Sequence, residues 1–399
     1  MDFFTYIVWT ASPEIFPGLS FEALGIDFSF LGNIRWYGLL FALGFIISQQ
    51  IMYHIFEKEG KPQKDVDSLT IFMIVATILG ARLGHVFFYE AGRYLQNPMD
   101  ILKIWEGGLA SHGGAIGILI AIHLYINYYI DIRIFPPRFV WKKKKRPQQS
   151  YLWVVDRVVL VTALVGCFIR FGNFMNSEII GKPTESSIGV VFAKNIENAI
   201  ELKSFVQEVS IEKSEISDMA NPVDIHVAFS SQVNSDTLAN MIVAQQIKPI
   251  LYEPHISVGN YSYVNPAPDH LNVGKDMDLP VDIQQRKGQY TATITAPAKA
   301  RHAAQLYESI SCLILFFILL GLWRKKKGDL PEGQLFGIFL IYIFGLRFFY
   351  EFLKENQAPF ENDIPLNMGQ WLSIPLVLLG IFILVNISKF QPKKTSAST

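Results

Sequence analysis

The chain has 399 residues, half of them apolar and 31 of them Phe, with equal numbers of acidic and basic residues. A composition this apolar is typical of a membrane protein. A formal net charge of zero gives no overall attraction to nucleic acid, so we expect no nucleic-acid partner.

Residues 1–33 lack the basic start and the long apolar core of a cleavable signal peptide. Aromatic side chains recur in this segment, at Phe3, Phe4, Trp9 and Phe16. Because aromatic residues are enriched at membrane–water interfaces, we expect the segment to lie at the outer surface of the membrane.

Seven apolar stretches follow, each about as long as the 20 residues that a membrane-spanning helix needs. They lie at roughly 34–55, 68–89, 109–130, 151–169, 305–323, 334–353 and 370–388. Asp156, near the start of the fourth stretch, is expected to cap that helix.

The basic residues of the connecting loops predict the orientation. One set of connections is rich in them: Lys58, Lys61 and Lys64; Lys142, Lys143, Lys144, Lys145 and Arg146; Arg324, Lys325, Lys326 and Lys327; and Lys389, Lys393 and Lys394. The alternate connections are poor in them, with Arg93, Lys103 and Lys354. Because cytoplasmic loops carry the excess of Lys and Arg, the N-terminus is predicted outside and the C-terminus in the cytoplasm.

Between the fourth and fifth stretches the chain becomes polar. Residues 223–229 and 290–295 alternate like half-buried strands, and 237–247 reads as a short amphipathic helix. This pattern predicts a soluble insert at 182–300, and the alternation of spans places it outside. Cys167 and Cys312 lie in separate apolar runs, which indicates neither a disulfide framework nor metal-ligand spacing.

The predicted fold is therefore an all-α polytopic membrane protein of about seven transmembrane helices, with an α+β extracytoplasmic insert between spans 4 and 5. Its parts are an outer interfacial segment 1–33, spans 1–4 with a polar segment at 34–181, the head insert 182–300, spans 5–7 at 301–388 and a cytoplasmic tail 389–399.

Polar side chains of five predicted helices fall at one depth. At 1.5 Å of rise per residue, Arg82 and Arg347 each lie about 20 Å from the inner end of their span. The helices that begin outside start near Tyr37 and His112, and the fourth ends at Arg170. An arginine at a helix centre costs roughly 2.5–3.5 kcal/mol on insertion scales, so this shared level in the outer third of the membrane indicates a functional site.

Each residue also has a structural interpretation. Arg347 and Glu351 have the spacing of an i,i+4 ion pair, and Arg82 has the length to reach the outer headgroups. His112 could be a core or interfacial histidine, and Tyr37 could belong to an aromatic belt at the membrane surface. Glu178 could cap a helix end or pair locally. Their common depth favours the functional interpretation.

Several arginines at headgroup depth favour a phosphate ligand, because guanidinium groups bind phosphate oxygens bidentately. Apolar helices around them suit acyl chains, so the implied substrate is an anionic phospholipid of the outer leaflet. A neutral His accepts a proton from an incoming nucleophile, and Asn and Tyr side chains orient hydroxyls or a leaving phosphate.

Six sequence motifs, in this order, carry a resemblance to a known family. They are Arg35-Trp36-Tyr37-Gly38, Gly80-Ala81-Arg82-Leu83-Gly84, Trp105 through Gly114 with His112-Gly113-Gly114, Arg170 through Gly181 with Asn173, Asn176 and Glu178, and Arg301 through Glu308 followed by Arg347 through Glu351. On these motifs the chain resembles bacterial prolipoprotein diacylglyceryl transferases. It departs from them at Ile169, where the family usually has Gly, and at Ala303, where it has Pro.

The resemblance implies seven spans, an outside N-terminus and an outside head. It also implies an enzyme of lipoprotein biosynthesis in the bacterial cytoplasmic (inner) membrane, without a cofactor or metal. Such an enzyme transfers the diacylglyceryl group of phosphatidylglycerol to the lipobox cysteine of a prolipoprotein, forms a thioether and releases glycerol 1-phosphate. The functional residues that carry over are Tyr37, His112, Arg170, Asn173, Glu178, Gly181, Arg347 and Glu351.

On this resemblance His112 is the candidate base, while Arg170 and Arg347 hold the phosphate. Glu178 and Glu351 orient these arginines. The remaining predicted substrate-binding residues are Tyr37, Arg82, Asn173, Asn176 and Gly181.

Two other functions fit parts of the pattern. A transporter or flippase of a phosphorylated lipid also needs buried arginines, but such sites usually lie near the midplane, often between inverted repeats. A non-catalytic assembly factor would use the insert as its binding module and would leave the buried arginines without a role.

Overall fold

The computed structural model describes residues 6–19, 22–23, 26–27, 32–103, 108–133, 138–143, 145–216, 218–258, 261–286, 288–355 and 365–391. Several residues used in the sequence predictions lie outside this part of the chain: Phe3, Phe4, residues 105–107, Lys144, Lys393 and Lys394. The chain divides into two compact units. The head unit comprises Met1–Phe41, Phe168–Ile310 and Phe348–Gln370, and the helical unit comprises Ala42–Cys167, Ser311–Arg347 and Trp371–Thr399.

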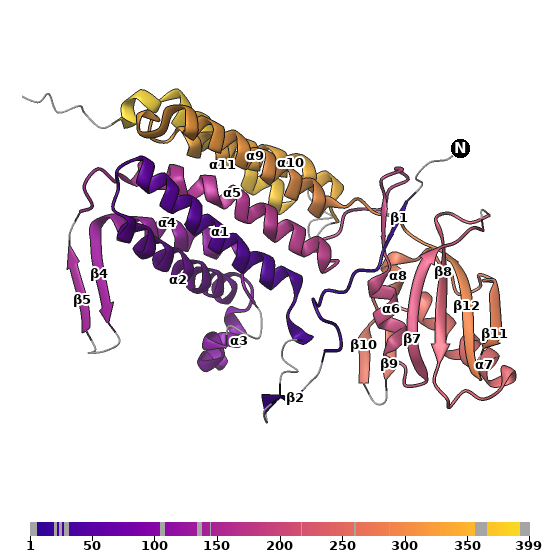
Figure 1. Ribbon diagram of the computed structural model, residues 1–399. Helices are drawn as coiled ribbons and strands as arrows, with labels where there is room; N and C mark the ends of the chain where they lie inside the picture. The colour runs from indigo at the N-terminus through magenta and orange to yellow at the C-terminus, as the bar shows by residue number, and fades with distance from the viewer. Residues whose placement is uncertain are drawn as a thin grey trace, which may run out of the picture. The chain divides into compact units, whose positions relative to one another are not determined.

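Six helices among the described residues are long and apolar enough to cross a membrane. They are α1 (Trp36–Lys58), α2 (Gln63–Phe88), α5 (Tyr151–Met175), α9 (Ala304–Lys326), α10 (Gln334–Tyr350) and α11 (Met368–Val385), all labelled in Figure 1. These helices confirm a multi-pass membrane protein.

The predicted third span corresponds to α4 (Ser111–Asn127), an apolar helix of 17 residues. The prediction that this helix continues to residue 130 is wrong, because the chain leaves α4 as strand β4 (Tyr128–Arg133), which pairs with β5 (Arg138–Lys143). Aromatic and β-branched residues favour the extended conformation in this stretch. A seventh membrane crossing by α4 stays a prediction.

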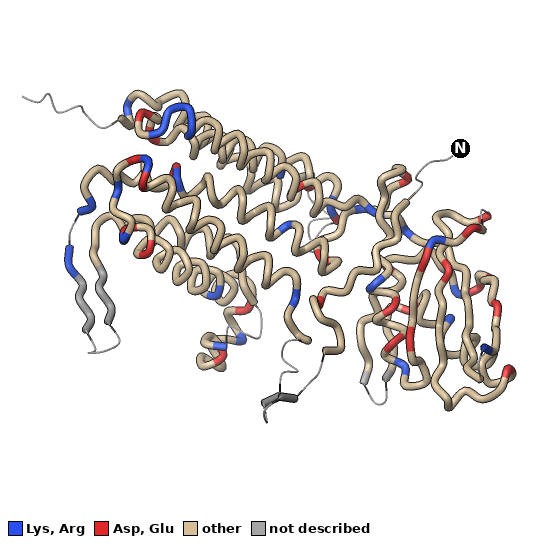
Figure 2. The backbone as a smooth tube through the Cα atoms, viewed as in Figure 1, with Lys and Arg blue, Asp and Glu red and all other residues tan. Residues whose placement is uncertain are grey.

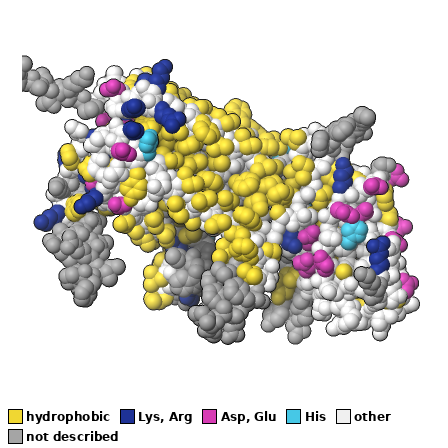
Figure 3. All heavy atoms as spheres, in the orientation of Figure 1, with side chains coloured by type: hydrophobic (Ala, Val, Ile, Leu, Met, Phe, Trp, Pro, Cys, Tyr) yellow, Lys and Arg dark blue, Asp and Glu magenta, His cyan; other side chains and the backbone are white. Residues whose placement is uncertain are grey.

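The outer faces of the helices carry apolar side chains. Leu79 and Phe87 of α2 are 55% and 69% exposed, and Leu378 of α11 is 60% exposed. Figure 3 shows hydrophobic side chains covering the helices on the visible face. Apolar surface of this extent is expected where lipid rather than water surrounds the helices.

Basic residues gather toward one end of the helical unit, as Figure 2 shows. Lys58 ends α1, and Arg324, Lys325 and Lys326 end α9. The same end carries the β4–β5 hairpin, whose sequence includes Lys142 and Lys143. This gathering agrees with the charge pattern that predicts a cytoplasmic face, although the orientation itself stays a prediction.

Near this end, a buried ion pair joins the turn after α1 to α5, and a hydrogen bond links the same turn to α9. Arg157 is fully buried, and its Nη2 lies 2.8 Å from Oε2 of Glu59. The Nε1 atoms of Trp153 and Trp323 donate to the same carboxylate at 2.9 and 2.6 Å. Arg157 therefore neutralises the buried carboxylate and the two indole N–H groups satisfy its remaining hydrogen bonds, as a buried charge requires.

The prediction that Asp156 caps its own helix is wrong, because α5 already begins at Tyr151. Its carboxylate instead accepts hydrogen bonds from the backbone N–H groups of Gly333 at 2.7 Å and Phe336 at 2.8 Å. Asp156 thus caps the first turn of α10, a tertiary contact that the local sequence does not reveal.

Replacing Glu59 with Gln is expected to destabilise the protein by about 3–5 kcal/mol, because the substitution leaves the Arg157 charge buried and uncompensated. Thermal unfolding of the purified protein in detergent measures the effect. Glu57→Gln is the matched control, since Glu57 is an exposed carboxylate two residues earlier, in the last turn of α1. Equal melting temperatures for the two variants would contradict a stabilising role of the pair.

The centre of the head unit is a four-stranded antiparallel sheet in the order β11-β12-β8-β7. Its strands are β7 (Val206–Lys213), β8 (Pro222–Phe229), β11 (Val281–Arg286) and β12 (Gln289–Pro297). Ile225, Val227 and Phe229 alternate along β8 and are fully buried, while the residues between them are partly exposed. Strands β8 and β12 confirm the strands predicted at 223–229 and 290–295.

Short helices and strands complete the head unit. They are α6 (Lys194–Glu201), α7 (Asp236–Ile242), α8 (Ala267–His270), β9 (His255–Val258) and β10 (Tyr261–Val264). The helix predicted at 237–247 is α7 with a π-helical continuation at Val243–Ile247.

The N-terminal segment joins this unit. Strand β1 (Ile7–Trp9) pairs in parallel with β6 (Val190–Phe192). The hydroxyl of the buried Tyr6 donates to the carbonyl of Pro222 at 2.5 Å. Part of the predicted interfacial segment therefore packs against the insert, a pairing between distant residues that no local pattern indicates.

His270 gives the head unit a predicted pH dependence. The side chain is buried, and its Nε2 lies 2.9 Å from Nδ2 of Asn195. Burial, with the nearby charges of Arg301 and Lys299, lowers the pKa of His270 to about 4. The unfolded chain, with a His pKa near 6.5, binds more protons between these values, so stability falls as the pH drops from about 6.5 toward 4.

The expected loss is at most about 3 kcal/mol, and His270→Gln should remove it. Melting temperatures between pH 7 and pH 4.5 measure the effect, with His226→Gln on the sheet surface as the control. A wild-type pH slope that His270→Gln leaves unchanged would assign the dependence to other groups.

Candidate functional site

Arg170 lies near the end of α5 and contacts a carboxylate on α9. Its Nε is 2.5 Å from Oε2 of Glu308. The Glu308 side chain is 11% exposed, whereas the Arg170 side chain is 27% exposed. One edge of the guanidinium is therefore fixed by protein, and part of the group remains accessible to a ligand.

Glu308 also binds a second cation. Its Oε1 contacts Nζ of Lys354, whose side chain is 6% exposed. The same ammonium lies 3.6 Å from Oε1 of Glu351, and Glu351 accepts a hydrogen bond from Asn367 Nδ2 at 3.1 Å. Arg170, Glu308, Lys354 and Glu351 thus form a chain of alternating charges, which compensates each buried charge with an opposite one.

The segment after Arg170 is a compact polar turn organised around Glu178. The Nδ2 atoms of Asn173 and Asn176 donate to the two carboxylate oxygens of Glu178, at 3.2 and 3.1 Å. Gln305 on α9 donates to the backbone carbonyl of Glu178 at 2.5 Å. Arg170 Nη1 lies 3.5 Å from Oδ1 of Asn173, so the turn adjoins the guanidinium.

Two non-glycine residues of this turn adopt left-handed backbone conformations, Ser177 at φ 54° and Ile179 at φ 55°. For a β-branched residue such as Ile179 this conformation is strained, at a cost of order 1–3 kcal/mol. Surrounding contacts must hold the turn in place, and strain of this kind is concentrated at functional sites.

Gly181 closes the turn, where two other segments leave no room for a side chain. A Cβ atom there would lie 2.5 Å from the carbonyl oxygen of His302 and 2.9 Å from that of Leu353. Its own carbonyl accepts from Arg301 Nη1 at 3.1 Å, and its backbone bridges to Lys354. Gly181, predicted as a substrate-binding residue, therefore has a steric role in the structure, and its backbone bridge helps to position Lys354.

Tyr37 lies in the first turn of α1, beside α5. A Cβ on Gly172 would be 2.9 Å from the Cα of Tyr37, so glycine permits the close approach of the two helices. Tyr37 also lies within electrostatic range of both Arg170 and Glu178. The head unit thus brings together Tyr37, Arg170, Asn173, Asn176, Glu178, Gly181 and Glu351 of the predicted site.

The other predicted site residues, Arg82, His112 and Arg347, belong to the helical unit. Arg82 is 3% exposed and donates to backbone carbonyls of Ile101 at 2.9 Å and Lys103 at 3.1 Å. It also donates to the carbonyl of Gly108 at 3.3 Å. In the structure, this guanidinium holds the connection that leads into α4. The predicted contact of Arg82 with the substrate stays a prediction.

His112 is the second residue of α4 and is exposed. Arg347, on α10, lies within electrostatic range of its ring. The backbone N–H of Ala110, just before α4, donates to the carbonyl of Ala81 at 2.9 Å, so α2 fixes the start of the helix that carries His112. The helical unit therefore places a base candidate near a cation.

Glu308, Lys354 and Gln305 were not among the site residues predicted from the sequence. Glu308 ends a motif that it quoted, and Lys354 follows Glu351 by three residues, but the pairing of each requires tertiary structure. The carboxylate in contact with Arg170 is Glu308, whereas the Glu178 carboxylate accepts from two asparagines. Among the described residues, no group of three His, Cys, Asp or Glu side chains is placed to hold a metal ion.

Comparison with known proteins gives a consistent result. The family model described as prolipoprotein diacylglyceryl transferase matches residues 26–386. Three relatives carry the name phosphatidylglycerol–prolipoprotein diacylglyceryl transferase. The protein of Tolumonas auensis is 33% identical over 89% of this chain and 92% of its own length. That of Chloroherpeton thalassium is 32% identical over 99% of this chain and 100% of its own length. That of Porphyromonas gingivalis is 31% identical over 96% of this chain and 95% of its own length. The chain therefore belongs to the prolipoprotein diacylglyceryl transferase family.

Proposed function

We propose that this protein transfers the diacylglyceryl group of phosphatidylglycerol to a cysteine thiol of prolipoproteins, the first step of lipoprotein maturation. Family membership and the names of the relatives support the reaction and its two substrates. The structural observation that carries the proposal is the partly accessible guanidinium of Arg170, held by Glu308 next to the turn around Glu178. A lipid–flippase function is not favoured, because the relatives are named as transferases.

The phosphate of the lipid binds to arginines in this proposal. Arg170 offers the edge of its guanidinium that Glu308 does not occupy, and Arg347 provides the second cation. Glu308 and Lys354 keep Arg170 in one orientation, so little reorganisation is needed as charge grows on the leaving phosphate. Asn173, Asn176 and Tyr37 orient the glycerol hydroxyls.

The chemical step is a displacement at carbon. The thiolate sulfur of the lipobox cysteine attacks the carbon of the diacylglyceryl group that bears the phosphate ester, and the C–O bond between that carbon and the phosphate breaks. A thioether forms, and glycerol 1-phosphate leaves with the electron pair. His112 accepts the thiol proton, because a free thiol with a pKa near 8.5 is mostly protonated at neutral pH.

The membrane arrangement is part of the same proposal. Seven spans, with α4 as the third, place the N-terminus and the head outside the bacterial cytoplasmic membrane and the basic end of the helices inside. Lipid substrate and lipobox peptide then meet at the outer leaflet, where binding both in one site supplies proximity. The insert at 182–300 is large enough to contact the peptide.

Mass spectrometry of a lipobox peptide tests the reaction directly. After incubation with purified protein and phosphatidylglycerol, the peptide should gain the mass of one diacylglyceryl group, and glycerol 1-phosphate should appear in equal amount. A peptide with Ser in place of the cysteine should remain unmodified. An unmodified cysteine peptide, with lipid moved between leaflets, would favour transport instead.

A further inference from the structure

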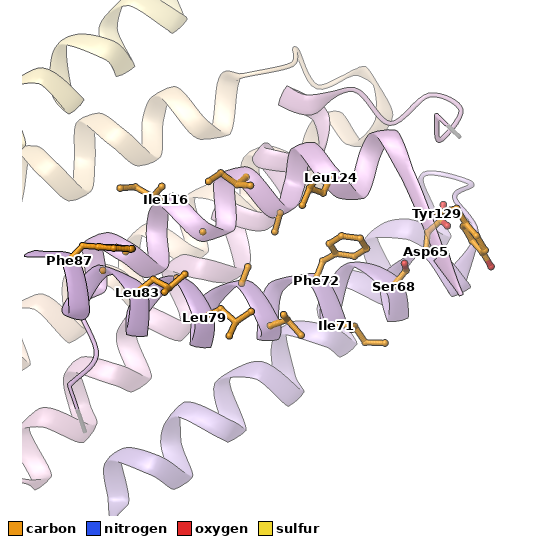
Figure 4. Close-up of a pocket in the computed structure, with 18 of the residues that line it drawn as sticks. Asp65, Ser68, Ile71, Phe72, Leu79, Leu83, Phe87, Ile116, Leu124 and Tyr129 are labelled. Carbon is orange, nitrogen blue, oxygen red and sulfur yellow. The ribbon is translucent and has the colours of Figure 1, made fainter. Parts of the chain in front are cut away.

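An apolar groove runs along α2 and α4 in the helical unit, with a volume of about 830 Å³. Its walls are aliphatic and aromatic side chains, and Figure 4 shows Leu79, Leu83 and Ile116 among them. Leu79 is 55% exposed and Ile116 52% exposed, so the groove is open to the surroundings of the helices.

Close packing of the two helices forms the floor of this groove. A Cβ on Gly113 would lie 2.1 Å from the carbonyl oxygen of Gly80, so only glycine allows the two backbones to approach this closely. The larger side chains on either side of this contact then stand up as walls. The close backbone contact fixes the floor of the groove, and a long, flexible ligand such as an acyl chain fits a groove of this form.

The two ends of the groove differ in polarity. Lys64, Ser68 and Tyr129 line one end, and Phe87 and Phe88 line the other. Figure 4 shows Ser68 and Tyr129 together with Asp65 at the polar end and Phe87 at the opposite end.

The acidic residue of the polar end is already neutralised. Asp65 accepts from Arg146 Nε at 3.4 Å and from Gln149 Nε2 at 2.6 Å. Ser68 Oγ accepts from Arg146 Nη2 at 3.1 Å, which leaves its own proton to donate. Lys64 is exposed, and no ion pair joins it to another described residue. This end therefore presents an ammonium and hydroxyl donors to an anion.

We infer that the groove is a binding site for an anionic phospholipid, distinct from the transfer site. The lipid phosphate lies against Lys64, Ser68 and Tyr129, and one acyl chain follows α2 toward Leu83. From Ser68 to Leu83, α2 rises about 22 Å. One leaflet contributes roughly 15 Å to the hydrocarbon core, so this stretch of the groove is long enough for one acyl chain. The headgroup end is about 18 Å along α4 from His112, counted from Leu124, so this lipid is not the one undergoing transfer.

Photo-crosslinking in proteoliposomes tests the site. Phosphatidylglycerol with a diazirine in one acyl chain should label peptides of α2 and α4 in the wild-type protein, and phosphatidylcholine with the same chain should label them far less. Lys64→Gln should lower the phosphatidylglycerol labelling about fivefold, the effect of one lysine on binding to anionic lipid. Lys325→Gln, at the end of α9, is the matched control and should not lower it.

Ala76→Phe, which fills the groove from its own lining, should abolish labelling there while diacylglyceryl transfer continues. Equal labelling by both lipids would show ordinary boundary lipid and overturn the inference, as would labelling that Lys64→Gln leaves unchanged. Transfer activity is measured in the same vesicles, so loss of the proposed reaction and loss of this site are separate outcomes.

Discussion

Replacing Arg170 with Ala is expected to lower kcat/KM for diacylglyceryl transfer by about 10²–10³-fold, while the protein still inserts and folds. The guanidinium is the only part of the side chain that reaches both Glu308 and the turn around Asn173. Without it, no positive charge from α5 opposes the charge that develops on the leaving phosphate. Transfer to a lipobox peptide, followed by mass spectrometry, measures the loss.

Arg170→Lys should recover only part of the activity, because a lysine ammonium lacks the planar fork that binds carboxylate and phosphate together. Arg286→Ala, on the edge strand β11 of the head sheet, is the control and should remain fully active. Wild-type activity in Arg170→Ala would eliminate the phosphate-binding role assigned to this residue.

Replacing His112 with Ala is expected to lower the rate by about 10²–10⁴-fold, the usual contribution of a general base. His112 stands at the start of α4, exposed and within electrostatic range of Arg347. His123→Ala provides the matched control, since His123 lies on the same helix, is exposed, and has its Nε2 3.5 Å from Nδ2 of Asn127.

A pH–rate profile does not identify the base by itself, because the substrate thiol titrates in the same range. A peptide with selenocysteine in place of the cysteine separates the two groups, since a selenol is already ionised at neutral pH. The deficit of His112→Ala should shrink strongly with this peptide if His112 removes the proton. An equal deficit with both peptides would assign His112 a positioning role instead.

Much of the helical framework could be predicted from the sequence. Long apolar runs predict helices because a membrane span requires about 20 apolar residues, and strands β8 and β12 are predicted because buried and exposed residues alternate along them. Arg170 and the asparagines after it stood out because charged and amide groups are costly at the end of an apolar run. These signals are local in the chain.

Contacts between distant segments could not be predicted in this way. Glu308 lies 138 positions after Arg170, and the ion pair between them depends on how α5 and α9 pack. Asp156 reads locally as a cap of its own helix, but it caps α10. The same holds for Arg82, whose partners are carbonyls of a loop about 20 residues later in the chain.

A double-mutant cycle on Arg170 and Arg347 tests the central proposal, that both arginines hold one lipid phosphate. The kcat/KM for transfer would be measured for Arg170→Ala, Arg347→Ala and the double variant. Because residues that act as a unit have strongly non-additive effects, the double variant should be hardly less active than either single variant, with a coupling energy above about 1 kcal/mol. If the two single-variant losses in transition-state stabilisation add up to the loss in the double variant, the two arginines do not share one phosphate.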